Sequence, residues 1–550
     1  MKICNFVDMK KIVFVLATSL MAAVAGWAQT LTGTVTCDGQ PLAGVCVSDG
    51  VEVVRTDVHG AYAIQSAKEQ GFVFVITPSG YTVPLRERLT PDFWARLTKP
   101  ADVPENHDFV LEKQNQDQYT VIFTTDLHLQ HSPKLNDFDM ARRTVFPLVQ
   151  RLYAQHRKKG PVVTFQLGDL VQDRYWYQYD MDPEKARVFL RDNGFTAPMY
   201  SVMGNHDHDG ARLADADHPD ITRYAEEPWR EAFGPTYYSM NIGNDHWVML
   251  DNILYYNEAP PREGEGKYGM KGNRRFVVGL TEGQFAWLEK DLAMVPAGTK
   301  VRVCGHASFI LPKTIGKDTE FADPAQVDRL YKMLRRFGPV NFYNGHAHRM
   351  YLTRNPRYPD ATDFTITASS GNIWNTGADK MQSMDAIDGG ILTGSFGKGE
   401  PVYAYETYLH GAKQLRAYDM NTVRANILEN KKAKERIAEF DYCTDYSTPD
   451  RENQVYVNAW MLLPGYTLEM YEGSHKLDVQ QVVEAEPLSL AGNNGKSFFT
   501  HKSYVQCYHL YKAQASKPNS TITIKVLDAR GKVVYKEKMK RPKAFSLDME

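Results

Sequence analysis

The sequence predicts an α/β protein in which a mixed central unit is flanked by two units rich in β-strands. Between residues 117 and 386, short apolar runs typical of buried strands alternate with segments of helical periodicity. Residues 29–113 and 388–550 instead alternate apolar and polar residues between turn residues. The length of 550 residues also exceeds that of one ordinary domain, so several units are expected.

Residues 1–28 have the pattern of an export signal. Lys10 and Lys11 form a positive start, residues 12–24 an apolar core, and Gly26-Trp27-Ala28 a cleavage site with small residues at both ends. The apolar core is too short for a membrane span, and no cysteine follows it to carry a lipid anchor. We therefore expect export to the periplasm or the outside of the cell, with no transmembrane segment in the mature chain.

Composition and charge exclude some classes of function. Hydrophobic residues make up 43% and charged residues 24% of the chain, as in ordinary globular domains. Loss of residues 1–28 removes three lysines and one aspartate, so the formal net charge falls from −2 to −4. Non-specific nucleic-acid binding is not expected of such a chain. Five cysteines remain, an odd number that argues against a disulfide framework; Cys37 and Cys46 are either a pair or, preferably, two buried thiols.

Residues 29–113 are expected to form a small β-sandwich. Strand patterns cover residues 33–36, 45–47 and 71–75, and residues 107–111 close the unit. This unit resembles the prealbumin-like or carboxypeptidase-regulatory repeats. Residues 113–118 look like a polar linker to the central unit.

The central unit, residues 117–386, should combine helices and layered sheets. Residues 141–156 have helical spacing, although Pro147 would kink or shorten that helix. Residues 282–292 and 325–337 are further helices, and a hairpin is expected across Gly243-Asn244. Such a mixture indicates an α/β sandwich.

The C-terminal unit, residues 388–550, returns to β-like alternation. Residues 454–460 and 521–526 alternate cleanly, whereas residues 423–440 are charged and helical in pattern. The late lysines are expected on the solvated face of edge strands rather than in a binding patch: Lys532, Lys536, Lys538, Lys540 and Lys543.

Five short motifs carry the chemistry of the central unit, and most follow an apolar run that reads as a strand. They are Asp126-Leu127-His128, Gly168-Asp169, Gly204-Asn205-His206-Asp207, Gly305-His306 and Gly345-His346-Ala347-His348. Side chains at the ends of several strands are held rigidly and can meet at one site. Aspartate, asparagine and histidine without cysteine suit Mn, Fe or Zn.

These motifs, in this order, resemble the signature of the calcineurin-like metallophosphoesterase family over residues 119–383. The resemblance implies a layered αββα sandwich with two divalent or trivalent metal ions. It also implies hydrolysis of a phosphate mono- or diester by a metal-bridging hydroxide. Other hypotheses stay open: a nucleotide pyrophosphatase, a phospholipid head-group esterase, or a non-catalytic module that binds a surface glycan or a protein.

The same resemblance implies a role for each motif residue. Asp169 would bridge both ions. The first ion would be completed by Asp126, His128 and His348, and the second by Asn205, His306 and His346. His206 would stand near the leaving oxygen without binding metal, as an acid or a stabiliser of the transition state. Asp207 or Asp173 could orient it.

Several further expectations concern the substrate and the flanking units. Arg174 could contact phosphate, and His131, His208 and Trp374 could line the pocket. The substrate would be a small-molecule, lipid or sugar phosphoester, and the oligomeric state is left open. Behind its polar linker, the N-terminal unit is expected to be dispensable for chemistry on a small ester. The C-terminal unit is expected to pack on the catalytic unit.

Overall fold

The computed structural model describes residues 30–130, 137–173, 176–214, 218–256, 275–370, 383, 385–409, 411–441, 443–492, 506–547 and 549. The expected export signal lies outside these residues, and so do Arg174, His131 and Trp374. Within the described part, no helix is both long and apolar enough to cross a membrane. The five expected free cysteines are all described, and none of them forms a disulfide.

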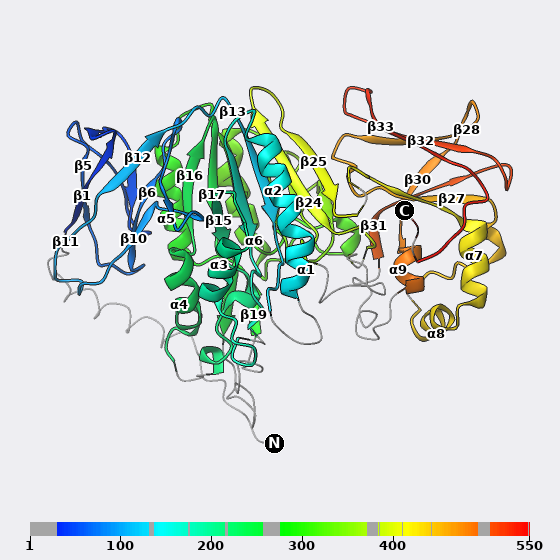
Figure 1. Cartoon of the computed structure of the whole chain (residues 1–550), viewed down its shortest axis with the longest axis horizontal. Helices are drawn as coiled ribbons and strands as arrows, with labels where there is room; N and C mark the ends of the chain where they lie inside the picture. Colours follow the sequence, from blue (N-terminus) through cyan, green and yellow to red (C-terminus); the bar gives the residue numbers. More distant parts are fainter. Residues whose placement is uncertain are drawn as a thin grey trace, which may run out of the picture.

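The N-terminal unit consists of two packed sheets, drawn in blue in Figure 1. One sheet has the order β11-β1-β12-β7 with β2 and β5 also on β1, and the other has the order β10-β6-β3-β4. The strands are β1 (Thr30–Cys37), β2 (Gln40–Pro41), β3 (Cys46–Ser48), β4 (Val53–Arg55), β5 (Ala61–Gln65), β6 (Phe72–Ile76), β7 (Tyr81–Thr82), β10 (Trp94–Arg96), β11 (Glu105–Asn106) and β12 (Phe109–Lys113), with a small hairpin of β8 (Leu85–Arg86) and β9 (Thr90–Pro91).

The central unit contains two sheets stacked face to face between layers of helices. The first sheet has the order β15-β14-β13-β24-β25, and the second β16-β17-β20-β21-β23-β22. Aromatic rings join them: Phe123 stacks on Tyr343 with ring centroids 4.9 Å apart, and Phe165 meets Trp247 at 4.8 Å. This confirms the predicted αββα sandwich.

The strands of the central unit are β13 (Gln118–Thr124), β14 (Val162–Leu167), β15 (Met199–Val202), β16 (Tyr238–Ile242), β17 (Asp245–Met249), β18 (Ile253–Tyr256), β19 (Arg275–Val278), β20 (Lys300–Cys304), β21 (Val340–Asn344), β22 (Tyr351–Thr353), β23 (Ala361–Thr365), β24 (Gly390–Gly397) and β25 (Val402–Thr407). The last two lie beyond residue 388, where a separate β-rich unit was expected. β24 pairs with β13 in antiparallel register, so these two strands extend the central sheet before the C-terminal sheets begin.

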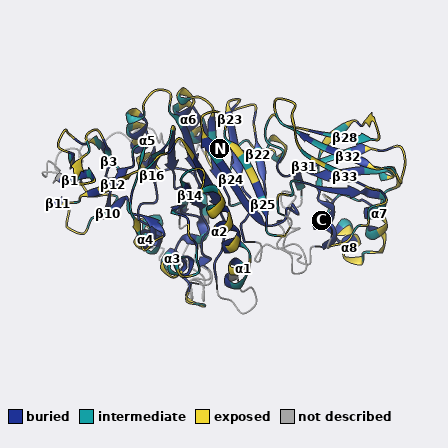
Figure 2. Ribbon diagram, turned by 45° about the horizontal axis from the view of Figure 1, so that its top comes forward, coloured by how far each residue is buried: buried dark blue, intermediate teal, exposed yellow. Residues whose placement is uncertain are grey.

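Helices cover both outer faces of the stacked sheets. They are α1 (Asp137–Arg143), α2 (Val145–His156), α3 (Pro183–Asp192), α4 (Ile221–Phe233), α5 (Glu282–Met294) and α6 (Pro324–Leu334). The first predicted helix, residues 141–156, is divided at Thr144: its first three residues belong to α1, and α2 begins at Val145. Pro147 thus lies in the first turn of α2, where a missing N–H costs no helical hydrogen bond. The outer side of α2 is exposed while its inner side is buried (Figure 2).

The C-terminal unit has two sheets and its own helices. The sheets have the orders β26-β27-β31-β30 and β29-β28-β32-β33. The elements are β26 (Arg416–Asp419), α7 (Met420–Glu429), α8 (Lys431–Glu439), β27 (Gln454–Asn458), β28 (Thr467–Glu472), β29 (His475–Lys476), β30 (Val479–Ala485), α9 (Pro487–Gly492), β31 (Gln506–Gln514), β32 (Ile522–Leu527) and β33 (Val533–Met539). The helical pattern over residues 423–440 thus becomes two helices, because Asn430 ends α7 and caps α8.

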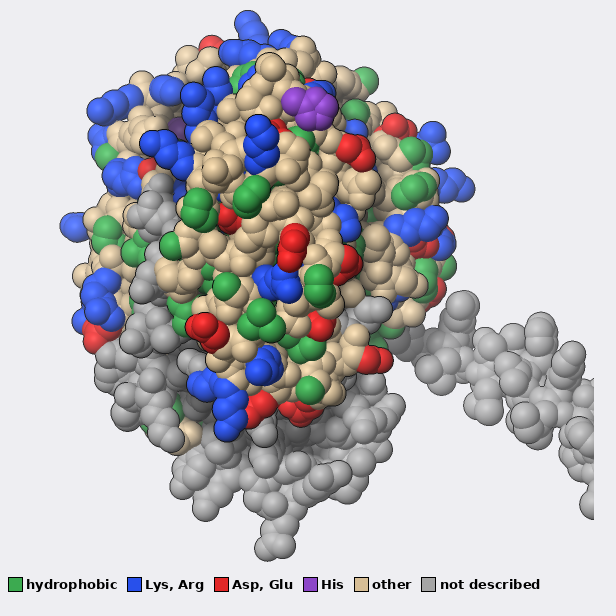
Figure 3. Space-filling view, turned by 90° about the vertical axis from the view of Figure 1, so that its right-hand side faces the viewer, with side chains coloured by type: hydrophobic (Ala, Val, Ile, Leu, Met, Phe, Trp, Pro, Cys, Tyr) green, Lys and Arg blue, Asp and Glu red, His purple; other side chains and the backbone are tan. Residues whose placement is uncertain are grey.

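The lysines of the last strand lie on an edge, as predicted. β33 is the outermost strand of its sheet, and Lys532, Lys536, Lys538 and Lys540 are exposed. Lys543 differs from the prediction, because it is half-buried and its Nζ donates to the carbonyl of Ala417 at 3.2 Å. Charged side chains of both signs are spread over this end of the molecule (Figure 3). Lysines on an exposed edge discourage pairing with other chains.

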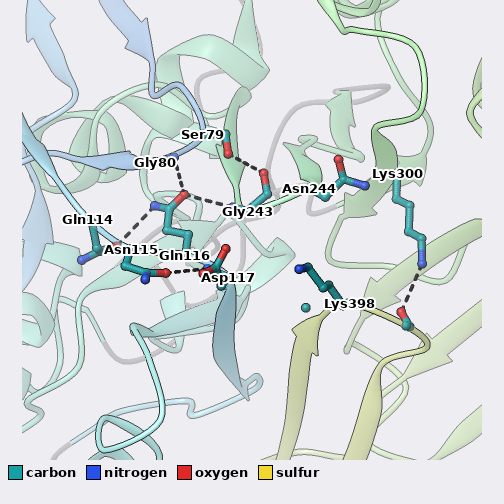
Figure 4. A pocket seen from close by; sticks show the side chains of 12 residues that line it. Ser79, Gly80, Gln114, Asn115, Gln116, Asp117, Gly243, Asn244, Lys300 and Lys398 are labelled. Carbon is teal, nitrogen blue, oxygen red and sulfur yellow. Dashed lines mark hydrogen bonds between the residues drawn. The ribbon is translucent and has the colours of Figure 1, made fainter.

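The connection between the N-terminal and central units is held in place, although its sequence looks like a linker. The side chain of Gln116 is buried, and its Oε1 accepts hydrogen bonds from the backbone N–H groups of Gly80 (2.8 Å) and Gly243 (3.0 Å). Its Nε2 donates to the carbonyl of Tyr81 at 2.8 Å. Figure 4 shows Gln116 between the two backbones, at the margin of a polar cavity of about 670 Å³. Gln116 therefore joins the N-terminal unit to the turn between β16 and β17.

Candidate metal centre

The five motifs meet at one edge of the stacked sheets. Residues following β13, β14, β15, β20 and β21 supply them, and β14 runs parallel to both β13 and β15. The carboxyl ends of these strands therefore lie side by side. All seven predicted metal ligands are among the described residues, and six of them are buried, with His346 about one-fifth exposed.

Two groups of ligand atoms form within this edge, and Asp169 belongs to both. One group contains Asp126, His128, Asp169 and His348, and the other contains Asp169, His306 and His346. In each group the ligand atoms lie within 4.8 Å of one another. Asn205 adjoins the second group, since its Oδ1 is 3.1 Å from Nε2 of His306. The arrangement matches the division of ligands that the resemblance implies.

Close approaches within the first group bring like donor atoms together. Nε2 of His128 lies 3.0 Å from Nε2 of His348, which in turn lies 3.2 Å from Oδ1 of Asp126. Nε2 of His128 is 3.8 Å from Oδ2 of Asp169. Imidazole nitrogens and carboxylate oxygens that converge in a buried space are the donors a cation would need, so the residues fit a metal ion.

Hydrogen bonds outside the two groups orient these side chains. Nδ1 of His306 faces the carbonyl of Leu167 at 2.8 Å, which turns Nε2 toward Asp169, 3.2 Å from Oδ2. Oδ2 of Asp126 accepts from the hydroxyl of Thr125 (2.7 Å) and from the backbone N–H of His346 (3.0 Å). Such contacts set the tautomer and direction of a metal-binding side chain.

The backbone of the site adopts a conformation that most residues avoid. Positive φ angles occur at five of the predicted ligands: Asp126 (52°), His128 (45°), Asp169 (52°), His346 (65°) and His348 (52°). The left-handed region costs an L-residue roughly 1–2 kcal/mol, and such strain concentrates at functional sites. The surrounding fold therefore holds these ligands at a conformational cost.

Two glycines of the motifs are required by the geometry. Gly168 has φ of 89°, and a Cβ there would lie 2.3 Å from Nδ1 of His306. A Cβ on Gly345 would lie 1.8 Å from the hydroxyl oxygen of Thr125. A sharp turn thus explains the first glycine, whereas close packing between two motifs explains the second.

The ionisation of Asp126, Asp169 and His128 suits cation binding. Burial alone would raise the pKa of the Asp126 carboxyl, but the His348 imidazole beside it holds that pKa at about 2. Burial also opposes ionisation of Asp169, yet His306 and His206 keep its pKa well below the ordinary value. Burial lowers the pKa of His128 to about 3. Both carboxylates are thus ionised and His128 neutral at neutral pH, the forms in which they bind metal.

His206 lies beside the two groups rather than within them. Its Nδ1 is 2.8 Å from Oδ1 of Asp173, which is fully buried, while about one-fifth of the His206 side chain is exposed. The structure therefore selects Asp173 as the partner of this imidazole. Arg174 lies outside the described residues.

Asp207 has a different place from the one predicted. Its two carboxylate oxygens accept hydrogen bonds from the backbone N–H groups of Val171 (3.0 Å) and Gly204 (2.8 Å). The predicted orientation of His206 by Asp207 is therefore wrong: Asp207 fixes the loop that carries Asn205 and His206. Burial, followed by the nearby Asp169 carboxylate, raises the pKa of Asp207 to about 7.

Other residues near the site were not singled out from the sequence. Oδ1 of Asn252 accepts from the backbone N–H of His306 at 3.0 Å, and Oε1 of Glu320 lies 3.5 Å from Nε2 of His346. Asn252 follows β17 much as the motif residues follow their strands, so its position was a usable signal. Glu320 lies in an irregular segment, and no sequence pattern there indicated a functional residue. His208, by contrast, was expected from the sequence as a residue that could line the pocket; it is buried, and the centroid of its ring lies 4.7 Å from that of Tyr255.

Family models match nearly the whole chain after the expected signal. They are described as the N terminal of calcineurin-like phosphoesterase (residues 29–114), calcineurin-like phosphoesterase (residues 119–350) and the C terminal of calcineurin-like phosphoesterase (residues 363–534). The chain belongs to the calcineurin-like phosphoesterases. This confirms the resemblance drawn from the five motifs, and it makes the protein a metallophosphoesterase, a hydrolase with a buried Asp/His cluster suited to metal.

Solved structures with remote similarity to this chain include a phosphatase and two nucleotidases. A dimetal phosphatase from Danio rerio is 13% identical, with a TM-score of 0.33 and coverage of 54% of this chain and 99% of that one. A 5'-nucleotidase from Candida albicans is 10% identical (TM-score 0.30; coverage 54% and 52%). The NAD nucleotidase of Haemophilus influenzae is 10% identical (TM-score 0.27; coverage 53% and 50%). Among curated proteins, no sequence matches this chain.

Proposed function

We propose that this metallophosphoesterase is an exported enzyme that uses two metal cations to hydrolyse a phosphate monoester or diester, with water as the nucleophile. The observation that carries the proposal is the pair of buried ligand groups that share Asp169. One carboxylate common to both groups is what a two-metal site requires, because the ions of such a site lie only about 3.5–4 Å apart.

The side chains would divide between two cations. Asp126, His128, Asp169 and His348 would hold one, and Asp169, Asn205, His306 and His346 the other. Bound cations would supply Lewis acidity, which activates water and neutralises charge on the phosphoryl oxygens. Mn, Fe and Zn suit this set of oxygen and nitrogen donors, which contains no sulfur.

His206 is suited to donate a proton to the leaving oxygen. Its Nδ1 faces the Asp173 carboxylate, and Nε2 is the ring atom through which it would act on the substrate. A buried carboxylate on one nitrogen fixes the orientation of the ring, as in other histidine–carboxylate pairs. The partial exposure of His206 gives a substrate access to it, whereas six of the seven candidate ligands are buried.

Two kinds of support favour a working enzyme over a module that only binds a glycan or a protein. The ligand set is complete, and its left-handed backbone is costly to maintain without a function. Export is proposed from the pattern of residues 1–28 alone. N-terminal sequencing of the protein released from cells should give residue 29 as the first residue, and an uncut chain that remains in the cytoplasm would contradict export.

The catalytic proposal is tested with p-nitrophenyl phosphate and bis-p-nitrophenyl phosphate, using protein reconstituted with Mn, Fe or Zn. We expect metal-dependent hydrolysis of at least one ester, and Asp169→Asn should lose more metal and more activity than Asp126→Asn. The comparison is matched because both substitutions remove one buried carboxylate charge. Two full ions in Asp169→Asn would refute the shared ligand. Metal-loaded wild-type protein inactive on both esters would favour the binding module.

A further inference from the structure

A cavity of about 420 Å³ lies between the central unit and the C-terminal unit. The central unit contributes β22 with the residues next to it and the segment 312–314. The C-terminal unit contributes the segment 459–466 and residues of β30 and β31. Protein interiors leave few voids larger than a water molecule, and ligand sites favour the junctions of domains. None of the predicted metal ligands lines this cavity, so it is distinct from the metal centre.

The floor of the cavity is aromatic. Tyr351, Trp460 and Tyr508 line it and are buried, and the rings of Tyr351 and Tyr508 meet edge to face with centroids 5.2 Å apart. Tyr466 and Tyr511 add two half-buried rings. Flat aromatic faces of this kind pack against planar bases or against the C–H faces of sugar rings.

The mouth of the cavity is positively charged. Lys313 and Arg354 are exposed and line it, while the set of lining residues includes no aspartate or glutamate. Nε of Arg354 is 3.3 Å from the hydroxyl of Thr362, which steadies the guanidinium. Two cations without a counterion among the lining residues favour an anionic ligand.

We propose that this interdomain cavity is a second ligand site, which binds a ring that carries an anionic group, such as an acidic sugar or a nucleotide. The ring packs against the half-buried Tyr466 and Tyr511, and the anionic group faces Lys313 and Arg354. The site does not depend on hydrolysis at the metal centre.

The cavity is nevertheless connected to the metal centre through the chain. Met350 and Tyr351 line the cavity and lie two and three residues after His348 in the chain. The backbone N–H of Met350 donates to Oδ2 of Asp385 at 3.1 Å, and the same oxygen is 2.9 Å from Nε2 of His509, another lining residue. Met350 and His509 are thus joined through Asp385, next to the turn after His348. A ligand in the cavity would contact both of these residues.

Calorimetric titration of the full-length mature, metal-loaded protein tests the proposal. Glucuronic acid represents the acidic sugars and adenosine monosulfate the nucleotides, and neither is a phosphoester that the metal centre could hydrolyse. Glucose, adenosine and inorganic sulfate separate the ring from the charge. We expect one equivalent of at least one ring-bearing anion to bind, and the three simpler probes to bind far more weakly. Which of the two anions binds identifies the source of the ligand.

Substitutions locate the binding. The double variant Lys313→Gln/Arg354→Gln should weaken binding roughly ten- to hundred-fold, the usual effect of losing hydrogen bonds to charged groups. The matched control Lys398→Gln/Lys538→Gln removes two exposed lysines elsewhere and should bind as the wild type does. Tyr511→Leu removes a half-buried ring of the cavity and should weaken binding several-fold at unchanged metal content. The proposal fails if neither anion binds, if sulfate alone binds as well, or if Lys313→Gln/Arg354→Gln binds like its control.

Discussion

The N-terminal and C-terminal units both consist of two β-sheets, but their contacts with the central unit differ in kind. Residues of the N-terminal unit and the central unit form one continuous hydrophobic cluster, in which Phe93 lies 4.7 Å from Tyr238 and Phe74 lies 6.3 Å from Trp287. The C-terminal unit has two hydrophobic clusters largely its own. Among the described residues, it contributes the buried Trp460 and Met461 to the continuous cluster, and Leu463 packs against that cluster.

Polar contacts occur at both junctions. At the N-terminal junction, the indole N–H of Trp287 donates to the hydroxyl of Ser48 (3.0 Å) and the hydroxyl of Tyr237 donates to the carbonyl of Gly50 (2.8 Å). Ion pairs also cross this junction, among them Arg96 with Glu227 at 2.6 Å. At the C-terminal junction, buried Arg416 pairs with buried Asp388 at 2.5 Å, and the rings of Tyr351 and Tyr508 meet. The N-terminal unit thus shares a hydrophobic core with the central unit, whereas the C-terminal unit packs mostly around its own clusters and meets the central unit at a buried ion pair and a small aromatic contact beside a cavity.

The largest effect should follow deletion of a whole unit. Removing residues 29–113 exposes Trp287, Tyr237 and Tyr238, and each buried aromatic side chain contributes roughly 1.5–3 kcal/mol. That loss approaches the whole stability of an ordinary domain, about 5–15 kcal/mol. We expect this variant to be insoluble or unfolded, whereas a chain ending after residue 413 should fold with a lowered Tm.

Soluble yield and thermal unfolding of both deletions measure the difference. The polar sequence of residues 113–118 led to the opposite expectation, a dispensable N-terminal unit. The protein without residues 29–113 could instead fold, bind metal and turn over a small ester within a few-fold of the wild type. That result would restore the expectation and would show that the N-terminal unit is no more integral to the central unit than the C-terminal unit is.

The next effect concerns the chemistry that the two units flank. His206→Ala should lower turnover by about 10²–10⁴, the range for a positioned acid or base, while metal content and Tm stay near those of the wild type. Turnover of a small ester and elemental analysis of the same preparation provide the measurement. Loss of metal in this variant would make His206 a ligand.

Breaking the buried ion pair of the C-terminal junction should cost less. Arg416→Met removes the guanidinium that pairs with the buried Asp388 carboxylate, and breaking a buried pair typically costs about 3–5 kcal/mol. Adding Asp388→Asn in the same chain should restore part of that stability, because it removes the carboxylate charge that Arg416 had balanced. Denaturant unfolding of the single and double variants measures both steps. An unchanged midpoint for Arg416→Met would show that the junction does not depend on this pair.

The smallest effect should arise at Gln116. Gln116→Ala removes three hydrogen bonds between the N-terminal and central units, but the cavity beside it admits water that can replace them (Figure 4). We expect a loss of about 1–2 kcal/mol in the free energy of unfolding. Asn115→Ala, on the exposed neighbour, is the matched control and should change it by less than about 0.5 kcal/mol. Equal losses in both variants would show that Gln116 contributes no more to stability than its exposed neighbour does.

The sequence predicted the metal centre well because its chemistry is local. Each motif follows its own strand, so the residue types and their order were enough to place Asp126, Asp169 and His348 together. The choice between Asp173 and Asp207 was not local. It depends on how the loop after β15 folds back on the loop after β14, and two aspartates at plausible spacing cannot be separated without that geometry.

The attachment of the flanking units was harder to predict for a related reason. The partners of Gln116 are Gly80 and Gly243, which lie 36 and 127 residues away, so a polar residue that fixes a junction looks the same in sequence as one in a loose linker. Similarly, the alternating pattern of β24 and β25 indicates strands but not the sheet they join. Hydrophobic periodicity reports burial, and it does not report the partner.

The left-handed backbone at five candidate ligands has a consequence for how the site could change by mutation. Asparagine, aspartate and histidine are the side-chain-bearing residues found there most readily, and they are also ligand types. Metal binding and backbone conformation therefore favour the same few residue types at these positions. Glutamate and cysteine bind metals equally well in principle, but at these positions they would have to overcome an unfavourable backbone. Mutations that change which metal the site prefers are therefore limited to a few substitutions at these positions.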